Sequence, residues 1–217
     1  MSCPICETRK ERRFCPAVHG RICAVCCGEQ REVTLDCPGD CPYLQQARQR
    51  EKRDINEVPQ EDLFPQVEVR ERFLYEREPL IVGLTYGLVK AARADRRIAD
   101  RDAIAAVTAL ARSYQTLVNS GLVVGDATPN VAQQAITAEL ERMVAEYRQV
   151  EQQHLGAATL KNSEVLEALV FVARMGQAQT SGRPLSRAFL DFLFARFPQK
   201  DAAVVPAAGG EDRRIIL

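Results

Sequence analysis

The chain has 217 residues, of which 46% are hydrophobic, and its 29 basic and 29 acidic residues give a formal net charge of zero. This length suits a small module plus one domain of ordinary size, and the hydrophobic content is enough to build a core. The balanced charge excludes a global attraction to nucleic acid or to anionic membranes. No apolar run reaches the ~18–20 residues that a membrane-spanning helix needs, so we expect no membrane association.

All eight cysteines and one of the two histidines lie within residues 1–42, which we call the cysteine module. Zn²⁺ binds four thiolate or imidazole ligands in a tetrahedron, and a Cys-x-x-Cys turn supplies two of them from one loop. Eight ligand positions predict two zinc ions, with no open coordination position for catalysis. The nine candidate ligands are Cys3, Cys6, Cys15, His19, Cys23, Cys26, Cys27, Cys37 and Cys41.

Two further features of the module favour metal over disulfides. The chain begins with Cys3 and a charged segment instead of the apolar stretch of a signal peptide, so we expect a cytoplasmic protein whose thiols stay reduced. A segment this short cannot bury a sufficient core unaided, so the zinc ions would hold it together. Gly28 and Gly39 are predicted to supply positive φ angles for turns around the metal.

The order of the ligand pairs resembles the cross-brace zinc modules, namely the RING, B-box and HIT-type fingers. Cys3-Pro4-Ile5-Cys6-Glu7 looks like the first knuckle of a RING finger, and Cys15-Pro16 through His19 to Cys23 looks like its central Cys-His-Cys. In that family alternate pairs share one ion. The resemblance therefore implies one zinc on Cys3, Cys6, Cys23 and Cys26, and the other on Cys15, His19, Cys37 and Cys41.

The sequence departs from the RING pattern at three points. There are nine candidates for eight positions, so Cys27 could displace His19 or Cys26. The last pair, Cys37 and Cys41, is separated by three residues instead of two, and the segment before Cys15 is short for that family. A sequential arrangement, with the first four ligands on one ion and the last four on the other, stays open beside the cross-brace.

Residues 43–65 are predicted to form a helix and a linker. Residues 43–53 are polar and rich in helix formers, which indicates a solvent-exposed helix leaving the cysteine module, with a charged linker as the alternative. Pro59 and Pro65 bracket a short loop that marks the candidate domain boundary.

The next segment, residues 66–198, is predicted to form an all-α bundle, so the fold class is mostly α. We expect a helix within 66–76 and another at 80–94 with Pro79 in its first turn. Asp100 is the predicted N-cap of the following amphipathic helix, which ends near Gly121. The clearest helix spans about residues 131–153.

The Glu151-x-x-His154 pair matches half of a di-iron site. No second histidine lies outside the cysteine module, so His154 is expected near a helix end.

The last predicted helices form the centre and one wall of the bundle. Residues 165–175 are apolar nearly all round, which indicates a central helix. Pro184 is predicted to start the last helix. Its apolar face would pack into the core, with an exposed docking surface as the alternative, and comprises Leu185, Phe189, Phe192, Leu193 and Phe197. Residues 199–217 are predicted to be a flexible tail, whose apolar end at 215–217 could dock on a partner or on the bundle.

No reaction centre is recognisable in the helical part, because it contains no Gly-rich phosphate loop and no Ser-His-Asp set. We therefore expect a non-enzymatic zinc-binding adaptor whose module and bundle dock a protein partner. One alternative is RING-like ubiquitin transfer, which requires Ile5 and Val25 to form an exposed apolar groove and is excluded if both are buried. The other is a nucleic-acid-binding regulator acting through the basic residues Arg9, Lys10, Arg12 and Arg13.

Overall fold

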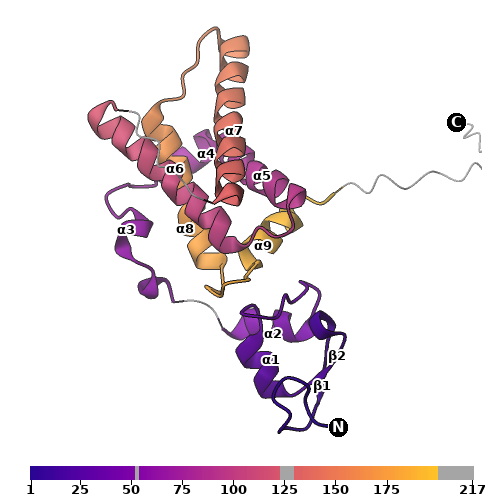
Figure 1. Cartoon of the computed structure of the whole chain (residues 1–217). Coiled ribbons are helices and arrows are strands. Elements are labelled where there is room, and N and C mark those ends of the chain that lie inside the picture. The colour runs from indigo at the N-terminus through magenta and orange to yellow at the C-terminus, as the bar shows by residue number, and fades with distance from the viewer. Residues whose placement is uncertain (52–53, 123–129, 200–217) are drawn as a thin grey trace, which may run out of the picture.

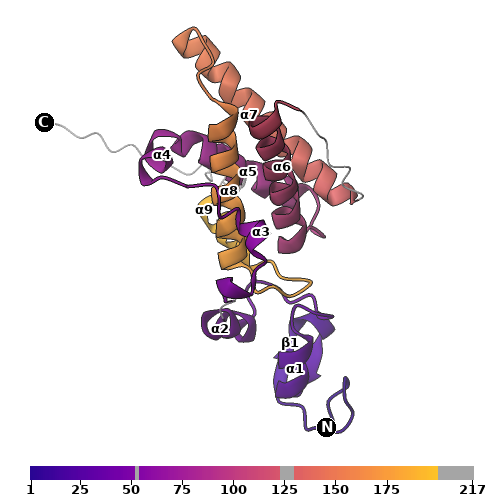
Figure 2. The ribbon, with the colours of Figure 1, turned by 90° about the vertical axis from the view of Figure 1, so that its left-hand side faces the viewer.

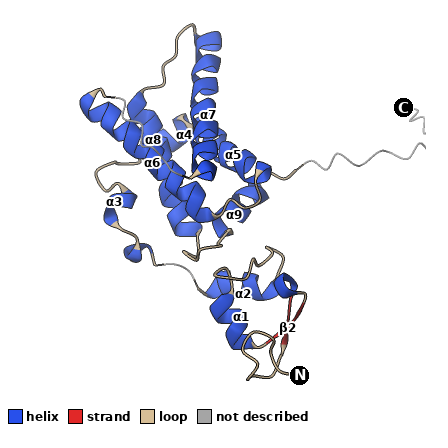
Figure 3. Ribbon diagram, in the orientation of Figure 1, coloured by secondary structure: helices blue, strands red, loops and turns tan. Residues whose placement is uncertain are grey.

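A computed structural model describes residues 1–51, 54–122 and 130–199, and this part of the chain is mostly helical. The predicted tail lies outside the described residues from position 200 onward. Figures 1 and 3 show a small N-terminal unit joined to a larger group of helices. Among the described helices, none is both long enough and apolar enough to cross a membrane.

The N-terminal unit is a hairpin followed by two short helices. Strand β1 (Arg13–Cys15) pairs antiparallel with β2 (Gly20–Ile22), and the 3₁₀ turn η1 (Pro16–Val18) connects them. Helices α1 (Ala24–Gln30) and α2 (Pro42–Arg50) follow. The buried core of this unit is mostly thiols, and its members are Cys3, Cys15, Ile22, Cys23, Cys26, Cys27 and Leu35. With Leu44 and Ala47 of α2, the unit buries four aliphatic side chains, which are too few to stabilise it by burial alone.

The larger group of helices is the predicted bundle. The short elements η2 (Ile55–Glu57), α3 (Gln60–Leu63) and α4 (Glu71–Glu76) lead into it. Its long helices are α5 (Glu78–Ala94), α6 (Asp100–Ser120), α7 (Val131–Leu155), α8 (Asn162–Gln179) and α9 (Ala188–Arg196). Helix α8 contacts α3, α5, α6 and α9 and is buried on nearly every side, which confirms it as the central helix.

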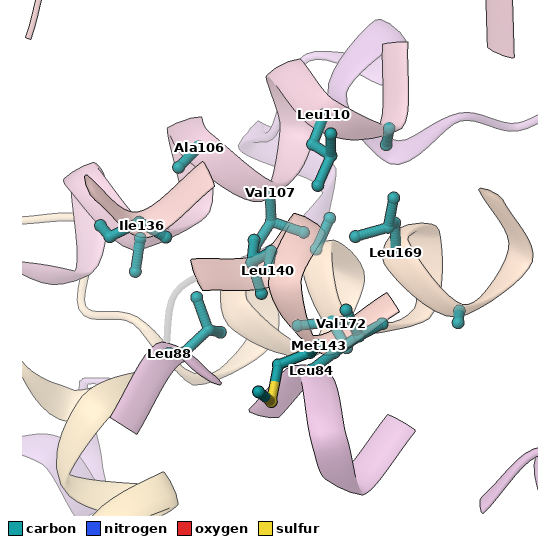
Figure 4. Close-up of a cluster of buried hydrophobic side chains, with 14 of the residues drawn as sticks. Leu84, Leu88, Ala106, Val107, Leu110, Ile136, Leu140, Met143, Leu169 and Val172 are labelled. Atoms are coloured by element: carbon teal, nitrogen blue, oxygen red, sulfur yellow. The ribbon is translucent and has the colours of Figure 1, made fainter. Parts of the chain in front are cut away.

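Apolar residues at helical spacing build one continuous core between these helices. Figure 4 shows Leu84, Val107, Leu140 and Leu169 meeting from four different helices, and all four are fully buried. Helices α6 and α8 cross closely at Gly176, where an added Cβ would lie 2.8 Å from Ile104 Cγ1. The predicted helix limits near Pro79 and Gly121 are also confirmed, since Pro79 lies in the first turn of α5 and Gly121 caps α6 with φ of 71°.

The prediction that Asp100 caps its own helix is wrong. Ala99 is the N-cap of α6, and the Asp102 carboxylate accepts the Ala99 amide at 3.1 Å. The buried Asp100 carboxylate instead accepts the Phe189 and Leu190 amides at the start of α9, both at 3.1 Å, and the Ser186 hydroxyl at 2.7 Å. It caps a helix that lies 89 residues further along the chain.

Three other local predictions are corrected. Pro184 does not start α9, which begins at Ala188, because residues 180–187 form a loop that contacts the cysteine module. Helix α2 exists, but one of its faces is buried through Leu44 and Ala47 instead of being solvent-exposed all round. Gly28 lies inside α1, and neither it nor Gly39 has a positive φ. The non-glycine residues Glu7, His19 and Glu32 adopt that conformation in the module.

The cysteine module is fixed to the bundle by buried polar contacts. Glu32 is 2% exposed, and its carboxylate accepts from Arg48 at 2.8 Å and from Ser181 at 2.9 Å. Arg48 also binds Asp191 of α9 at 2.7 Å, and the Leu185 amide donates to the Glu32 carbonyl at 2.8 Å. Figures 1 and 2 show the loop before α9 lying against the N-terminal unit. We call these contacts the Glu32 junction.

Candidate metal centre

Four cysteine sulfurs converge between the N-terminal turn at residues 3–6 and the start of α1. The Sγ atoms of Cys3, Cys6, Cys23 and Cys26 all lie within 4.8 Å of one another, and those of Cys6 and Cys23 are 3.9 Å apart. Ligands at ~2.3 Å from a tetrahedral zinc ion are themselves about 3.8 Å apart. These four free thiols could therefore hold one metal ion with little rearrangement. We call them the first cysteine group.

The first group combines the first and third ligand pairs, as the cross-brace arrangement predicts. The sequential arrangement would have combined Cys3 and Cys6 with Cys15 and His19, which do not join this group.

Local backbone structure forms both Cys-x-x-Cys turns of this group. In the first turn, the Glu7 amide donates to the Cys3 carbonyl at 2.7 Å, and Glu7 closes the turn with φ of 55°. In the second, Cys23 is the N-cap of α1, and its Sγ accepts the Cys26 amide at 3.3 Å.

Within the first cysteine group, the surroundings lower the pKa of Cys6 and raise the pKa of Cys26 relative to the ordinary value of a thiol. The Thr8 hydroxyl and the Arg9 and Thr8 amides lower the pKa of Cys6 to about 5. Burial and the neighbouring thiols raise the pKa of Cys26 to about 12. The group loses its first proton readily, but four thiolates together require a cation to offset their repulsion. This donor set, all sulfur and largely buried, fits a thiophilic divalent metal.

Two basic residues of the predicted nucleic-acid loop lie beside thiols, an arrangement that sequence reasoning missed. Hydrogen bonding to the Cys23 thiolate and the charge of Cys6 raise the pKa of Arg9. The Arg13 guanidinium donates to Cys27 Sγ at 3.8 Å and lies 4.6 Å from the centroid of the Tyr43 ring. In the sequence, the one feature that indicates these contacts is that Arg9 and Arg13 lie close to cysteines along the chain.

The other four cysteines line the same small cavity, and His19 is not part of that lining. Cys15, Cys27, Cys37 and Cys41 line one small cavity between β1, α1 and the start of α2. His19 is exposed and ends the 3₁₀ turn η1 with φ of 49°. These four sulfurs are less tightly grouped than those of the first group, which is the one set among the described residues with all potential ligand atoms within 4.8 Å.

The Glu151-x-x-His154 pair, which matches half of a di-iron site, has structural contacts in the bundle. Glu151 is buried, and its carboxylate accepts from Arg77 at 2.7 Å and from the Thr159 and Leu160 amides at 2.8 Å each. Burial alone would raise the pKa of Glu151, but these hydrogen bonds lower it. His154 lies exposed in the last turn of α7, as expected.

The bundle carries an open apolar groove of about 530 Å³ between α4, α5, α8 and α9. Its apolar lining comprises Leu74, Tyr75, Ile81, Val82, Phe171, Met175, Phe192, Leu193 and Phe197. Phe189 and Leu193 are buried in the core as predicted, whereas Phe192 and Phe197 are only partly buried and line this groove. Comparison of the chain with protein-family models, with curated proteins and with solved structures finds no match.

Proposed function

We propose that the chain is a non-enzymatic docking protein whose cysteine module is held in shape by zinc, two ions in all. The first cysteine group supports zinc, because four protein thiolates leave no open position and suit a structural ion. Reduced thiols also suit the cytoplasm, which we propose as its compartment. Metal analysis of the purified chain, with iron measured beside zinc, tests the ion's identity.

The observation that carries the docking role is the exposure of two apolar side chains beside the first group. Ile5 and Val25 occupy the same third position of the two Cys-x-x-Cys turns, and they are 37% and 41% exposed. Both turns surround one candidate ion, so these side chains flank the same site. The junction with the bundle uses Glu32 and α2 instead, which leaves the turns free to contact a protein partner. We call Ile5 and Val25 the knuckle surface.

Site-specific photo-crosslinking in the full-length chain tests this surface. A photoreactive residue at position 25 should form an adduct with one protein from the native cytoplasm, and the substitution Ile5→Glu should abolish it. The same photoreactive residue at position 131, an exposed site on α7, provides the matched control. Circular dichroism and zinc content must be unchanged by Ile5→Glu. Identical adducts from positions 25 and 131 would refute a docking role for the knuckle surface.

Exposure of Ile5 and Val25 also keeps the ubiquitin-transfer alternative open, since burial of both would exclude it. That function predicts faster discharge of ubiquitin from a charged conjugating enzyme, and loss of this effect with Ile5→Glu. The nucleic-acid alternative rests mainly on Lys10 and Arg12, since Arg9 and Arg13 face thiols. A gel shift at low salt, compared with charge reversal at these basic residues, tests it.

A further inference from the structure

Two adjacent cysteines on one helix face different parts of the module. Cys26 and Cys27 lie side by side in α1, and successive helical residues point about 100° apart around the axis. Cys26 faces the first cysteine group, whereas Cys27 faces a cavity shared with Cys15 and with the 37–41 turn. One short helix therefore supplies a thiol to each of two separate clusters.

The cavity beside Cys27 has the size and lining of an ion site. Its volume is about 10 Å³, close to that of one water-sized sphere. Four cysteines from three different elements line it, and most of the other walls are apolar, including Phe14, Leu35 and Leu44. The one charged group in the lining, Arg31, is paired with Glu51 at 2.7 Å. The cavity thus offers thiols to an ion and few oxygen partners to a water molecule.

A cationic side chain also lies beside this cavity. The Arg13 guanidinium donates to Cys27 Sγ at 3.8 Å. Cys15 and Cys27 belong to one buried cluster, and the partly buried Cys37 packs against it, so three of the four cysteines share one core.

We propose that Cys15, Cys27, Cys37 and Cys41 form a second metal site for one Zn²⁺ ion, with Cys27 in the place that sequence reasoning gave to His19. Binding would draw these sulfurs together, because they lie farther apart than those of the first group. The inference rests on the proposed function only in that both assign zinc to the module.

The second site would have a role distinct from that of the first. It joins β1 and α1 to residues 37–41, and the segment between its ligands carries the contacts with the bundle. Glu32 forms the junction, and an added Cβ at Gly39 would lie 3.0 Å from Asp191 Oδ2 of α9. The second ion would therefore fix the surface that docks on the bundle, while the first supports the knuckle surface.

Metal content of the full-length protein tests this assignment. Elemental analysis should give two zinc ions per chain for the unsubstituted protein and for His19→Asn, since asparagine tolerates the left-handed backbone of position 19. Cys27→Ser should retain one ion. Two ions in Cys27→Ser, or one in His19→Asn, would overturn the proposal.

The Cys6→Ser variant separates this inference from the proposed function. A single ion that is lost in Cys6→Ser but retained in Cys27→Ser would overturn the second site and leave the zinc-binding role intact. Absence of zinc from the unsubstituted chain would overturn both.

Cobalt substitution keeps the test decisive if Cys27→Ser fails to fold. The visible absorption of Co²⁺ distinguishes four thiolate ligands from three thiolates and one imidazole. The unsubstituted chain should bind two cobalt ions with all-thiolate spectra, and His19→Asn should leave those spectra unchanged. An imidazole-type spectrum that disappears in His19→Asn would overturn the assignment of Cys27.

Discussion

Replacement of Glu32 with alanine tests whether the cysteine module and the bundle form one unit. The substitution removes two contacts of a nearly fully buried carboxylate, with Arg48 at 2.8 Å and with Ser181 at 2.9 Å. The backbone is unaffected in principle, because alanine and glutamate share a Cβ and the same strain at φ of 54°. The hydrogen bond from the Leu185 amide to the carbonyl of residue 32 can also persist.

The expected cost follows from these contacts. Removing one partner of a fully buried ion pair costs about 3–5 kcal/mol. Arg48 is 19% exposed and keeps Asp191 at 2.7 Å, so we take about 2 kcal/mol for this part. The lost Ser181 hydrogen bond adds about 1 kcal/mol. A total of about 3 kcal/mol corresponds to a Tm decrease of roughly 6–12 °C for a chain of this length.

Urea unfolding followed by far-ultraviolet circular dichroism, with zinc in excess, measures the difference. The matched control is Glu76→Ala, which breaks an ion pair with Arg72 on the surface of α4, where Glu76 is 56% exposed. Exposed pairs of this kind contribute about 0.5 kcal/mol or less. Hydrogen exchange at residues 181–187 should rise in Glu32→Ala and not in the control. Equal stability and equal exchange in the two variants would refute the Glu32 junction.

Three further substitutions test the bundle. Gly176→Ala should destabilise by about 1–3 kcal/mol in urea unfolding, because the new Cβ would lie 2.8 Å from Ile104. Asp100→Ala should cost about 2–4 kcal/mol in the same assay and should raise hydrogen exchange in the first turn of α9, whose buried amides lose their acceptor. Arg77→Gln should flatten the acid limb of the stability profile, measured by urea unfolding from pH 7 to pH 3.5. Burial raises the pKa of Glu164 and of Glu151, but hydrogen bonds lower both pKa values below the ordinary value, and Arg77 is the leading lowering cause for Glu164. The contribution of these carboxylates is therefore complete above the unfolded value of about 4.3 and is lost as the pH falls through the lower folded values. Without Arg77 less of this contribution exists to be lost, and an unchanged acid limb would contradict the reasoning.

The helices of the bundle could be predicted because their signals are local. Apolar residues at a spacing of three and four residues predicted α7, and its structure spans Val131–Leu155. Asp100 and Pro184 were misassigned because their partners are distant in the chain. Asp100 is bound by amides of residues 189 and 190, and the loop containing Pro184 is shaped by contacts with Glu32. Neither contact leaves a periodic pattern in the sequence.

The candidate metal centre was predictable in part for a similar reason. Cys-x-x-Cys turns are local, and the resemblance to cross-brace modules implied that Cys3 and Cys6 share a site with Cys23 and Cys26, which the structure brings together. The choice between His19 and Cys27 depends on the direction in which each side chain points. That direction is set by helix α1, which begins at Ala24 and turns Cys27 away from Cys26. On the second site proposed above, a helix recognised after Cys23 would have favoured Cys27 from the sequence.

A junction made of buried charges has a consequence for the proposed docking role. Ion pairs such as Glu32–Arg48–Asp191 contribute little net stability compared with apolar contacts, because desolvation offsets most of their attraction. The contacts that cross to the bundle, from Arg48 to Asp191 and from Ser181 to Glu32, are satisfied in one relative orientation, and any other leaves the buried Glu32 carboxylate without its Ser181 partner. The junction therefore fixes the direction in which the knuckle surface faces relative to the groove between α4 and α9. On the proposed function, a partner that contacts both surfaces would recognise their spacing as well as their chemistry, and Glu32→Ala would weaken its binding without altering either surface.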